Sequence, residues 1–245
     1  MIKLAQTFSS SAKFSDQDFF VYQKENSSLA IIAEGRDLVD SPSSYAFLAA
    51  RTVKKVFEEV EKIPSLFKLM AMANENIAQL NKDLSCESNF KNWVGATAVC
   101  THIKKDILFY SFIGNCGIAI FDNEGNLKFK TINDVSNIII DKKSKETGCK
   151  KFVKKLFTKP SEERKAAQMY HGMLTGKSAV EAFMNTGVIR LKQGDIVVLY
   201  NNGFSKLLDL PEFGKSLLNI ANFEDFVYKH DNDPSEKGII VMSLD

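Results

Sequence analysis

The segment from Leu191 to Leu208, LKQGDIVVLYNNGFSKLL, constrains the fold more than any other part of the chain. Gly194-Asp195 is a turn pair, and Ile196–Tyr200 is an apolar run of strand length that is rich in β-branched residues. Asn201-Asn202-Gly203 then ends the strand, because glycine and asparagine favour turns. The segment predicts a buried strand that ends in polar side-chain and backbone oxygens. An ordinary strand followed by a loop explains the same residues.

The overall composition is typical of a soluble globular protein, and its net charge does not indicate binding to nucleic acid or to a membrane. Its 245 residues can bury a sizeable core, so one domain spanning residues 1–245 is the simplest expectation. The net charge is only +2, and no apolar run approaches the length of a membrane span. The first residues, MIKLAQTFSSSAKF, lack the apolar core of a signal peptide, which favours the cytoplasm.

The cysteines and histidines give no support for a zinc site. No CxxC pair or HExxH motif occurs, and free thiols in a reducing compartment are the expected state. The cysteines are Cys86, Cys100, Cys116 and Cys149.

The order of the predicted elements indicates an α+β fold, because strands cluster in one part of the chain and helices in another. The apolar stripes of the helices predict an antiparallel pair that lies on a sheet. Ser43 or Ser44 is expected to cap the first helix, which runs to about Val60, and Pro64 begins the second. The predicted strands are Asp18–Tyr22, Leu29–Ala33, Gly95–Ile103, Ile107–Ile113, Gly117–Phe121, Leu127–Lys130, Ile196–Tyr200 and Gly238–Ser243, with those from Gly95 to Lys130 forming an antiparallel meander.

Two further segments carry patterns that need interpretation. Gly172–Ser178, GMLTGKS, is similar to a nucleotide-binding P-loop, but one residue is missing between its glycines and a polar, helical segment precedes it. We therefore expect no nucleotide there, and Ser178 is expected to cap a short helix over Ala179–Met184. The lysine-rich segment Lys142–Lys155 is either a solvated loop or a contact surface for an acidic partner.

Acidic residues lie at the ends of the first predicted hairpin. Asp16 and Asp18 share one side of a strand, and Glu34 ends the neighbouring strand. Carboxylates so placed can share a hard cation, although solvated turn acids account for them equally.

Four segments, in order along the chain, resemble motifs of the type 2C metal-dependent protein phosphatases (PPM-type), in their bacterial branch. Lys13–Asp18 is similar to R-x-x-N-x-D, and Ile31–Gly35 to an apolar run followed by ADG. Gly95–Ala98 and Gly114–Ile120 are similar to GSTA and GDSRAYL. Tyr200–Phe204 and Ser235–Val241 are similar to SDG and to a final DD-x-T strand. The resemblance implies two packed antiparallel β-sheets flanked by helix pairs, a type 2C phosphatase-like α-β-β-α sandwich.

The resemblance also implies a chemistry in which two Mg²⁺ or Mn²⁺ ions activate a water that attacks a phosphoserine or phosphothreonine. When the family's site positions are matched to this sequence, Asp18 falls on an acidic position of the family site. Gly35 would offer its backbone carbonyl to a metal ion. Glu34 replaces the metal-bridging Asp, and Asn202 replaces an Asp ligand.

The remaining positions depart further from the family. Ser235 stands where the last Asp ligand is expected, with Glu236 or Asp233 as possible substitutes. Lys13 replaces the phosphate-holding Arg, and Asn115 replaces the Asp of GDSR.

Two functions follow from these departures. The first is a metal-dependent serine/threonine phosphatase of a phosphoprotein, with weakened activity. The second is a pseudophosphatase that binds a phosphoprotein or another protein, or serves as a structural subunit. Removing anionic ligands weakens a paired-metal site, because two dications close together repel each other.

Overall fold

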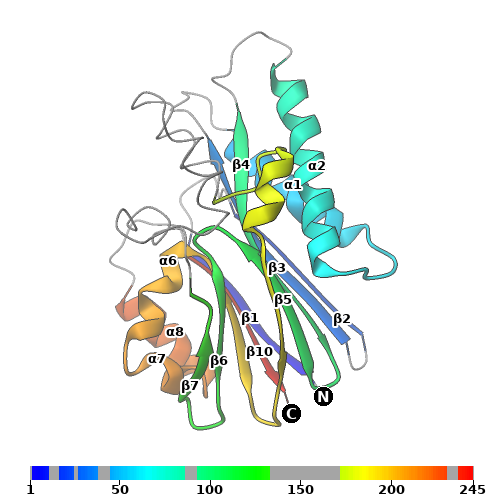
Figure 1. The fold of residues 1–245 in the computed structure, drawn as a ribbon. Helices are drawn as coiled ribbons and strands as arrows, with labels where there is room; N and C mark the ends of the chain where they lie inside the picture. The colour runs from blue at the N-terminus through cyan, green and yellow to red at the C-terminus, as the bar shows by residue number, and fades with distance from the viewer. Residues whose placement is uncertain are drawn as a thin grey trace, which may run out of the picture.

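The computed structural model describes residues 2–10, 17–24, 27–37, 45–85, 93–132, 172–230 and 237–244. Within these ranges the chain forms two five-stranded antiparallel sheets that pack face to face, with helices on the outside (Figure 1). The predicted α+β architecture is confirmed. None of the described helices is both long and apolar enough to cross a membrane.

The first sheet has the strand order β1-β10-β9-β6-β7 and the second β2-β3-β4-β5-β8. The strands of the first are β1 (Ile2–Ser10), β10 (Lys237–Leu244), β9 (Ile196–Tyr200), β6 (Gly117–Phe121) and β7 (Leu127–Lys130). Those of the second are β2 (Gln17–Lys24), β3 (Ser27–Asp37), β4 (Val94–Lys104), β5 (Ile107–Ile113) and β8 (Asn185–Arg190).

The central strands are buried on both faces, which explains their continuous apolar runs. In β3, Ala30 and Ile32 face the core between the sheets, whereas Ile31 and Ala33 face the helices. In β9, Val197 and Leu199 face the same inner core, and the alternate residues pack against the helices of the other side. This alternation also fixes the face on which the polar residues at the strand ends lie.

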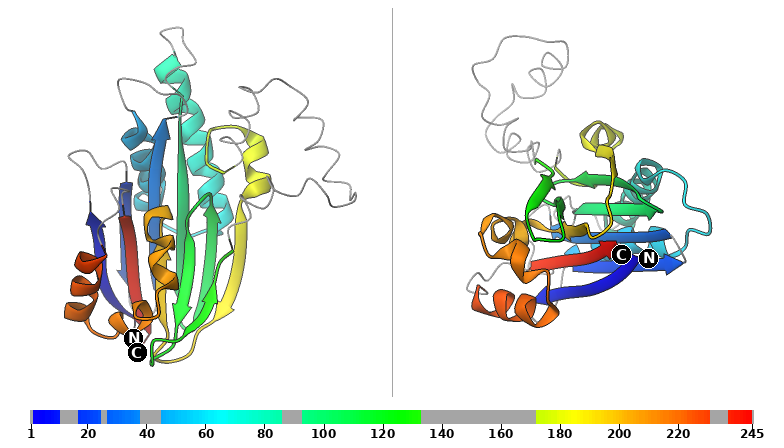
Figure 2. Two further views of the ribbon diagram at one scale, coloured as in Figure 1. Left: turned by 90° about the vertical axis from the view of Figure 1, so that its left-hand side faces the viewer. Right: turned by 90° about the horizontal axis from the view of Figure 1, so that it is seen from below.

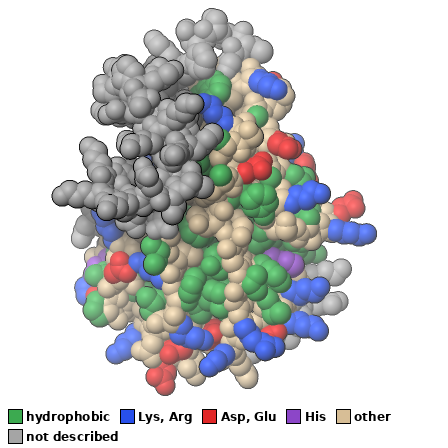
Figure 3. Space-filling view, in the orientation of Figure 1, with side chains coloured by type: hydrophobic (Ala, Val, Ile, Leu, Met, Phe, Trp, Pro, Cys, Tyr) green, Lys and Arg blue, Asp and Glu red, His purple; other side chains and the backbone are tan. Residues whose placement is uncertain are grey.

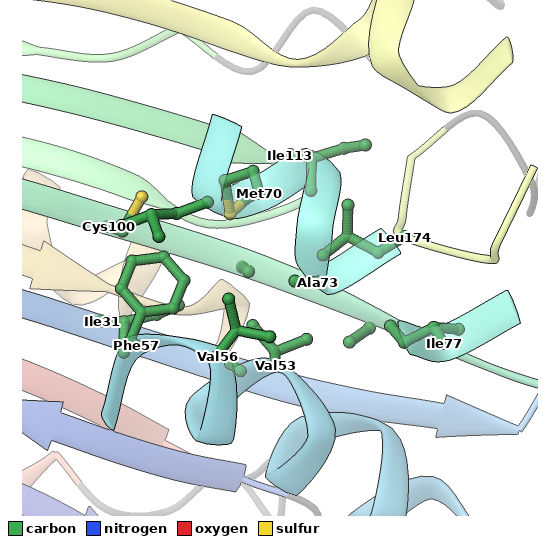
Figure 4. Close-up of a cluster of buried hydrophobic side chains, with 14 of the residues drawn as sticks. Ile31, Val53, Val56, Phe57, Met70, Ala73, Ile77, Cys100, Ile113 and Leu174 are labelled. Carbon is green, nitrogen blue, oxygen red and sulfur yellow. The ribbon is translucent and has the colours of Figure 1, made fainter. Parts of the chain in front are cut away.

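The helices α1 (Ala46–Glu58) and α2 (Leu66–Ser85) cover the outer face of the second sheet (Figures 1 and 4). The predicted helix pair is therefore confirmed, and Phe57, Met70 and Ile77 of its apolar stripes are fully buried. Ser65 accepts a hydrogen bond from the N–H of Lys68 at 3.2 Å and so caps α2. For α1 the N-cap residue is Tyr45, and the predicted caps Ser43 and Ser44 lie outside the described residues.

Short helical segments cover the outer face of the first sheet (Figure 2). They pack around Phe213, whose ring contacts those of Phe121, Phe223 and Phe226. The segments are α6 (Asn202–Ser205), the 3₁₀ turn η3 (Leu207–Asp209), α7 (Phe213–Ser216) and α8 (Ile220–Lys229).

Three sequence predictions need correction. The meander breaks after β5, because β6 lies in the other sheet and Gly114, with φ +89°, turns the chain across. Strands β1 and β8 were not predicted. Ser178 is the first residue of the 3₁₀ helix η2 (Ser178–Phe183) and not its cap; Lys177 holds the cap position.

Two buried asparagines of α2 hold the loop that precedes η2. Asn74 accepts the N–H groups of Thr175 and Gly176 at 3.1 and 2.8 Å, and its amide donates to the carbonyl of Lys177 at 3.1 Å. Asn81 bonds both backbone groups of Val94 and the carbonyl of Thr175. The loop is thereby joined to α2 and to the start of β4.

We expect Asn74→Ala to lower the free energy of unfolding by about 2 to 3 kcal/mol, because it leaves buried backbone groups without partners. Urea denaturation measures this change. The control is Gln79→Ala on the exposed side of α2, where the side chain bonds only Asp83 among the contacts described, and its expected cost is below about 0.5 kcal/mol. Equal effects of the two changes would contradict the role of Asn74.

Candidate functional site

Glu34 is the charged residue around which the candidate site is built. It lies near the end of β3 and is only 6% exposed, since its side chain shares the inner face of the strand with Ile32. Arg36, two residues along on the same face, donates from Nη2 to Oε1 of Glu34. Asn201 donates from Nδ2 to Oε2 at 3.1 Å. Both carboxylate oxygens of Glu34 therefore accept a hydrogen bond from the protein.

Asn201 links this carboxylate to the other sheet. It follows β9, is 1% exposed, and its Oδ1 accepts the N–H of Gly238 in β10 at 3.0 Å. Its own N–H donates to the carbonyl of Gly238 at 3.1 Å. Sequence comparison pointed to the next residue, Asn202, and missed Asn201. The structure places Asn202 at the exposed start of α6, where its carbonyl accepts from Ser205 Oγ at 2.8 Å.

Gly35 has a packing requirement that is independent of any metal. It is buried opposite Ala96 of β4, and a Cβ at this position would lie 1.8 Å from the carbonyl oxygen of Ala46. The start of α1 therefore sits directly on Gly35, and only glycine leaves the space. The glycine of the ADG-like segment is explained by this contact alone.

The other predicted site residues are placed only in part. Asp18 lies in β2 opposite Ala33, and its neighbour Gln17 lies opposite Glu34, so Gln17 and not Asp18 is the cross-strand partner of Glu34. The predicted residues Lys13, Asp16, Asp233, Ser235 and Glu236, and the segment Lys142–Lys155, lie outside the described residues.

Cys116 lies close to the site in the connection between β5 and β6. Its thiol is buried and donates to the carbonyl of Ile113 at 3.2 Å. Burial raises the pKa of the Cys116 thiol, and the nearby negative charge of Glu34 raises it further. The thiol therefore stays protonated at neutral pH and is not an activated nucleophile.

Solved structures that share this architecture include serine/threonine phosphatases. The serine/threonine phosphatase of S. agalactiae matches with a TM-score of 0.65 and 16% identity, over 100% of this chain and 99% of that chain. Stp1 from Staphylococcus aureus matches with 0.67 and 12%, over 100% and 96%. RsbX in complex with magnesium matches with 0.62 and 11%, over 100% of both chains. No protein-family model and no curated protein sequence matches the chain.

The chain has the type 2C serine/threonine phosphatase fold. The resemblance noted in the sequence is thus confirmed at the level of the fold. One structure with this fold is the catalytic domain of the serine/threonine protein phosphatase PstP in complex with two manganese ions. It matches with a TM-score of 0.64 and 14% identity, over 100% of this chain and 99% of that chain.

The described residues of this type 2C fold do not by themselves assemble a paired-metal centre. A dication would have to share the oxygens of Glu34 with Arg36 and Asn201, and the positive charge of Arg36 opposes a second cation at this carboxylate. Within the described ranges, no three His, Cys, Asp or Glu side chains gather closely enough to hold a metal ion. Asn201 contributes a neutral amide that donates to Glu34.

A shallow space of about 300 Å³ lies between α7 and α8, away from Glu34. Its lining includes Glu212, Asp225 and His230, and the His230 ring packs on Phe226 at 4.6 Å between centroids. None of the site residues named above contributes to it.

Three backbone donors at the centre of the loop Gly172–Ser178 are bonded within the protein. The N–H groups of Thr175 and Gly176 bond Asn74, and that of Leu174 bonds Ala96 at 2.8 Å. A phosphate-binding loop needs such N–H groups directed at the ligand. Lys177 lies over the Trp93 ring, 5.4 Å from its centroid. These contacts support the expectation that no nucleotide binds at this loop.

A double-mutant cycle on Glu34 and Arg36 tests the pairing at the site. We expect Glu34→Gln and Arg36→Met to show a coupling of about 1 kcal/mol in urea denaturation, because Glu34 is buried while Arg36 is half exposed and screened by solvent. The control pair is Lys55 and Glu59, which are exposed at 66% and 65% and should couple by about 0.3 kcal/mol. A coupling at Glu34 no larger than in this control would show that the two groups do not interact significantly.

Lys177→Ala tests the interpretation of the loop. We expect calorimetric titration with ATP and Mg²⁺ to give the same result for the natural protein and for this variant, since the loop amides are already bonded. Tight ATP binding that is lost on Lys177→Ala would establish a nucleotide site and contradict the structural argument.

Proposed function

We propose that this chain is a pseudophosphatase, a type 2C fold that acts as a phosphoprotein-binding or structural interaction module. The observation that carries the proposal is the bonding of both Glu34 oxygens by Arg36 and Asn201. A guanidinium beside the carboxylate provides the positive charge that a metal ion would otherwise supply. The fold can then remain stable without bound metal.

A second candidate function is a metal-dependent phosphatase with weak activity. It is favoured by the position of Glu34 at the end of β3 and of Asn201 at the end of β9, which the fold brings together from separate sheets. Mg²⁺ or Mn²⁺ would then be the cofactor. In this case Arg36 would have to leave Glu34 before a metal could bind.

Two features bear on the cellular location of the protein and on its binding partner. Cys100 and Cys116 are buried free thiols, as expected in a reducing compartment, and we propose the cytoplasm as the location. The basic segment Lys142–Lys155 stays a candidate surface for an acidic partner.

Calorimetric titration with Mn²⁺ separates the two functions. We expect weak or undetectable binding by the natural protein, and at least tenfold stronger binding, about 1.4 kcal/mol, when Glu34→Asp, Asn202→Asp and Ser235→Asp are combined. Adding Arg36→Met to the triple variant should strengthen binding further, because it frees one carboxylate oxygen. The control is Lys55→Met in the same background, which removes an exposed cation paired with Glu59 on α1.

Hydrolysis of p-nitrophenyl phosphate provides the second measurement. The natural protein should show no Mn²⁺-dependent turnover above that of the protein without metal. Robust metal-dependent turnover by the unmodified chain would refute the pseudophosphatase and establish the weak-phosphatase alternative or a stronger form of it.

A further inference from the structure

One end of the second sheet carries an apolar row that becomes exposed toward β8, on the face that α1 and α2 cover elsewhere. Its members are successive partners in the registers of β3, β4, β5 and β8: the buried Leu29, the half-buried His102, and the exposed Phe109 and Val188. Phe109 is 37% and Val188 62% exposed. The His102 and Phe109 rings stack with centroids 6.1 Å apart. The sheet therefore presents apolar side chains to solvent near its β8 edge.

A basic row lies next to this apolar row on the same face. Lys104, Ile107 and Arg190 are partners across β4, β5 and β8, each two residues from a member of the apolar row. Lys104 and Arg190 are exposed, and Arg190 bonds Asp106 at 2.8 Å. In the space-filling view, hydrophobic, Lys and Arg side chains lie side by side on the surface of the described residues (Figure 3).

Strand β8 is an edge strand within the described part of the fold, where its one neighbour is β5. The N–H of Leu191, just after β8, donates to the carbonyl of Asp106 at 2.8 Å and so points toward β5. Because backbone groups alternate in direction along a strand, those of Thr186, Val188 and Arg190 point away from β5. Such outward groups can pair with a further strand.

We propose that β8 accepts an extended segment of a partner protein as an added strand, and that this segment carries an acidic residue two positions from an apolar one. A residue opposite Val188 would share its face and contact the apolar row. A residue opposite Arg190 would lie on the basic row, where a carboxylate complements Arg190 and Lys104. Main-chain bonds would supply affinity and the two rows specificity. The proposal concerns a different surface from Glu34 and does not depend on whether that site hydrolyses phosphate.

The probe for this proposal is the fluorescein-labelled peptide Gly-Thr-Glu-Thr-Val-Thr-Glu-Thr-Gly, in which glutamate and valine alternate on one face of a strand. The matched control replaces both glutamates by lysine. Fluorescence anisotropy with the full chain should show binding of the acidic peptide at least tenfold tighter than that of the lysine peptide. Amide NMR shifts on adding the acidic peptide should be largest at Thr186, Val188 and Arg190.

Two variants test the mode of binding while keeping the main-chain donors that β8 directs at β5. Val188→Pro removes one outward N–H, which an edge strand tolerates, and Arg190→Glu reverses a charge on a side chain that is 81% exposed. Each should weaken binding of the acidic peptide at least tenfold. Lys215→Glu on α7 makes the same charge change outside the second sheet and should have little effect. Thermal unfolding of each variant confirms that it remains folded.

Three outcomes would overturn the proposal. The first is no binding of the acidic peptide up to about 1 mM, and the second is equal binding of the acidic and lysine peptides. The third is a dimer of the chain that Val188→Pro dissociates, because β8 would then pair with a second copy in place of an acidic partner.

Discussion

The pairing of Glu34 with Arg36 and Asn201 is the interaction on which the rest of the site depends. It joins the end of β3 in one sheet to the ends of β9 and β10 in the other, and it does so with a buried carboxylate. A buried charge is costly unless it is paired and hydrogen-bonded. Since Arg36 and Asn201 meet both needs, Glu34 needs no metal ion to be accommodated in the core.

This pairing also gives a physical reason why the type 2C fold would stay stable in the pseudophosphatase that we propose. Three hydrophobic clusters hold the sheets together: one lies between the two sheets and one lies under each helical layer. Glu34 belongs to none of these clusters. Gly35 is required by its contact with Ala46 of α1, whatever the neighbouring carboxylate binds. Scaffold and ligand positions can therefore change independently.

Much of the fold could be predicted because β3, β4 and β9 are buried on both faces and read as apolar runs bounded by turns. Strand β8 escaped prediction since Gly187 interrupts it and its residues alternate between exposed and half-buried positions. The sheet assignment of β6 depends on the turn at Gly114, which a local pattern does not reveal. In the site, Asn201 was missed although strand alternation places it on the inner face with Val197 and Leu199. The same alternation places Arg36 with Ile32 and Glu34, but motif comparison directed attention to Asn202.

A crystal structure of the natural protein grown with saturating MnCl₂, with an anomalous difference map for manganese, tests the central claim most directly. The account predicts that Arg36 and Asn201 stay bonded to Glu34 and that no manganese peak lies beside this carboxylate. A manganese peak coordinated by Glu34, with Arg36 displaced, would contradict it.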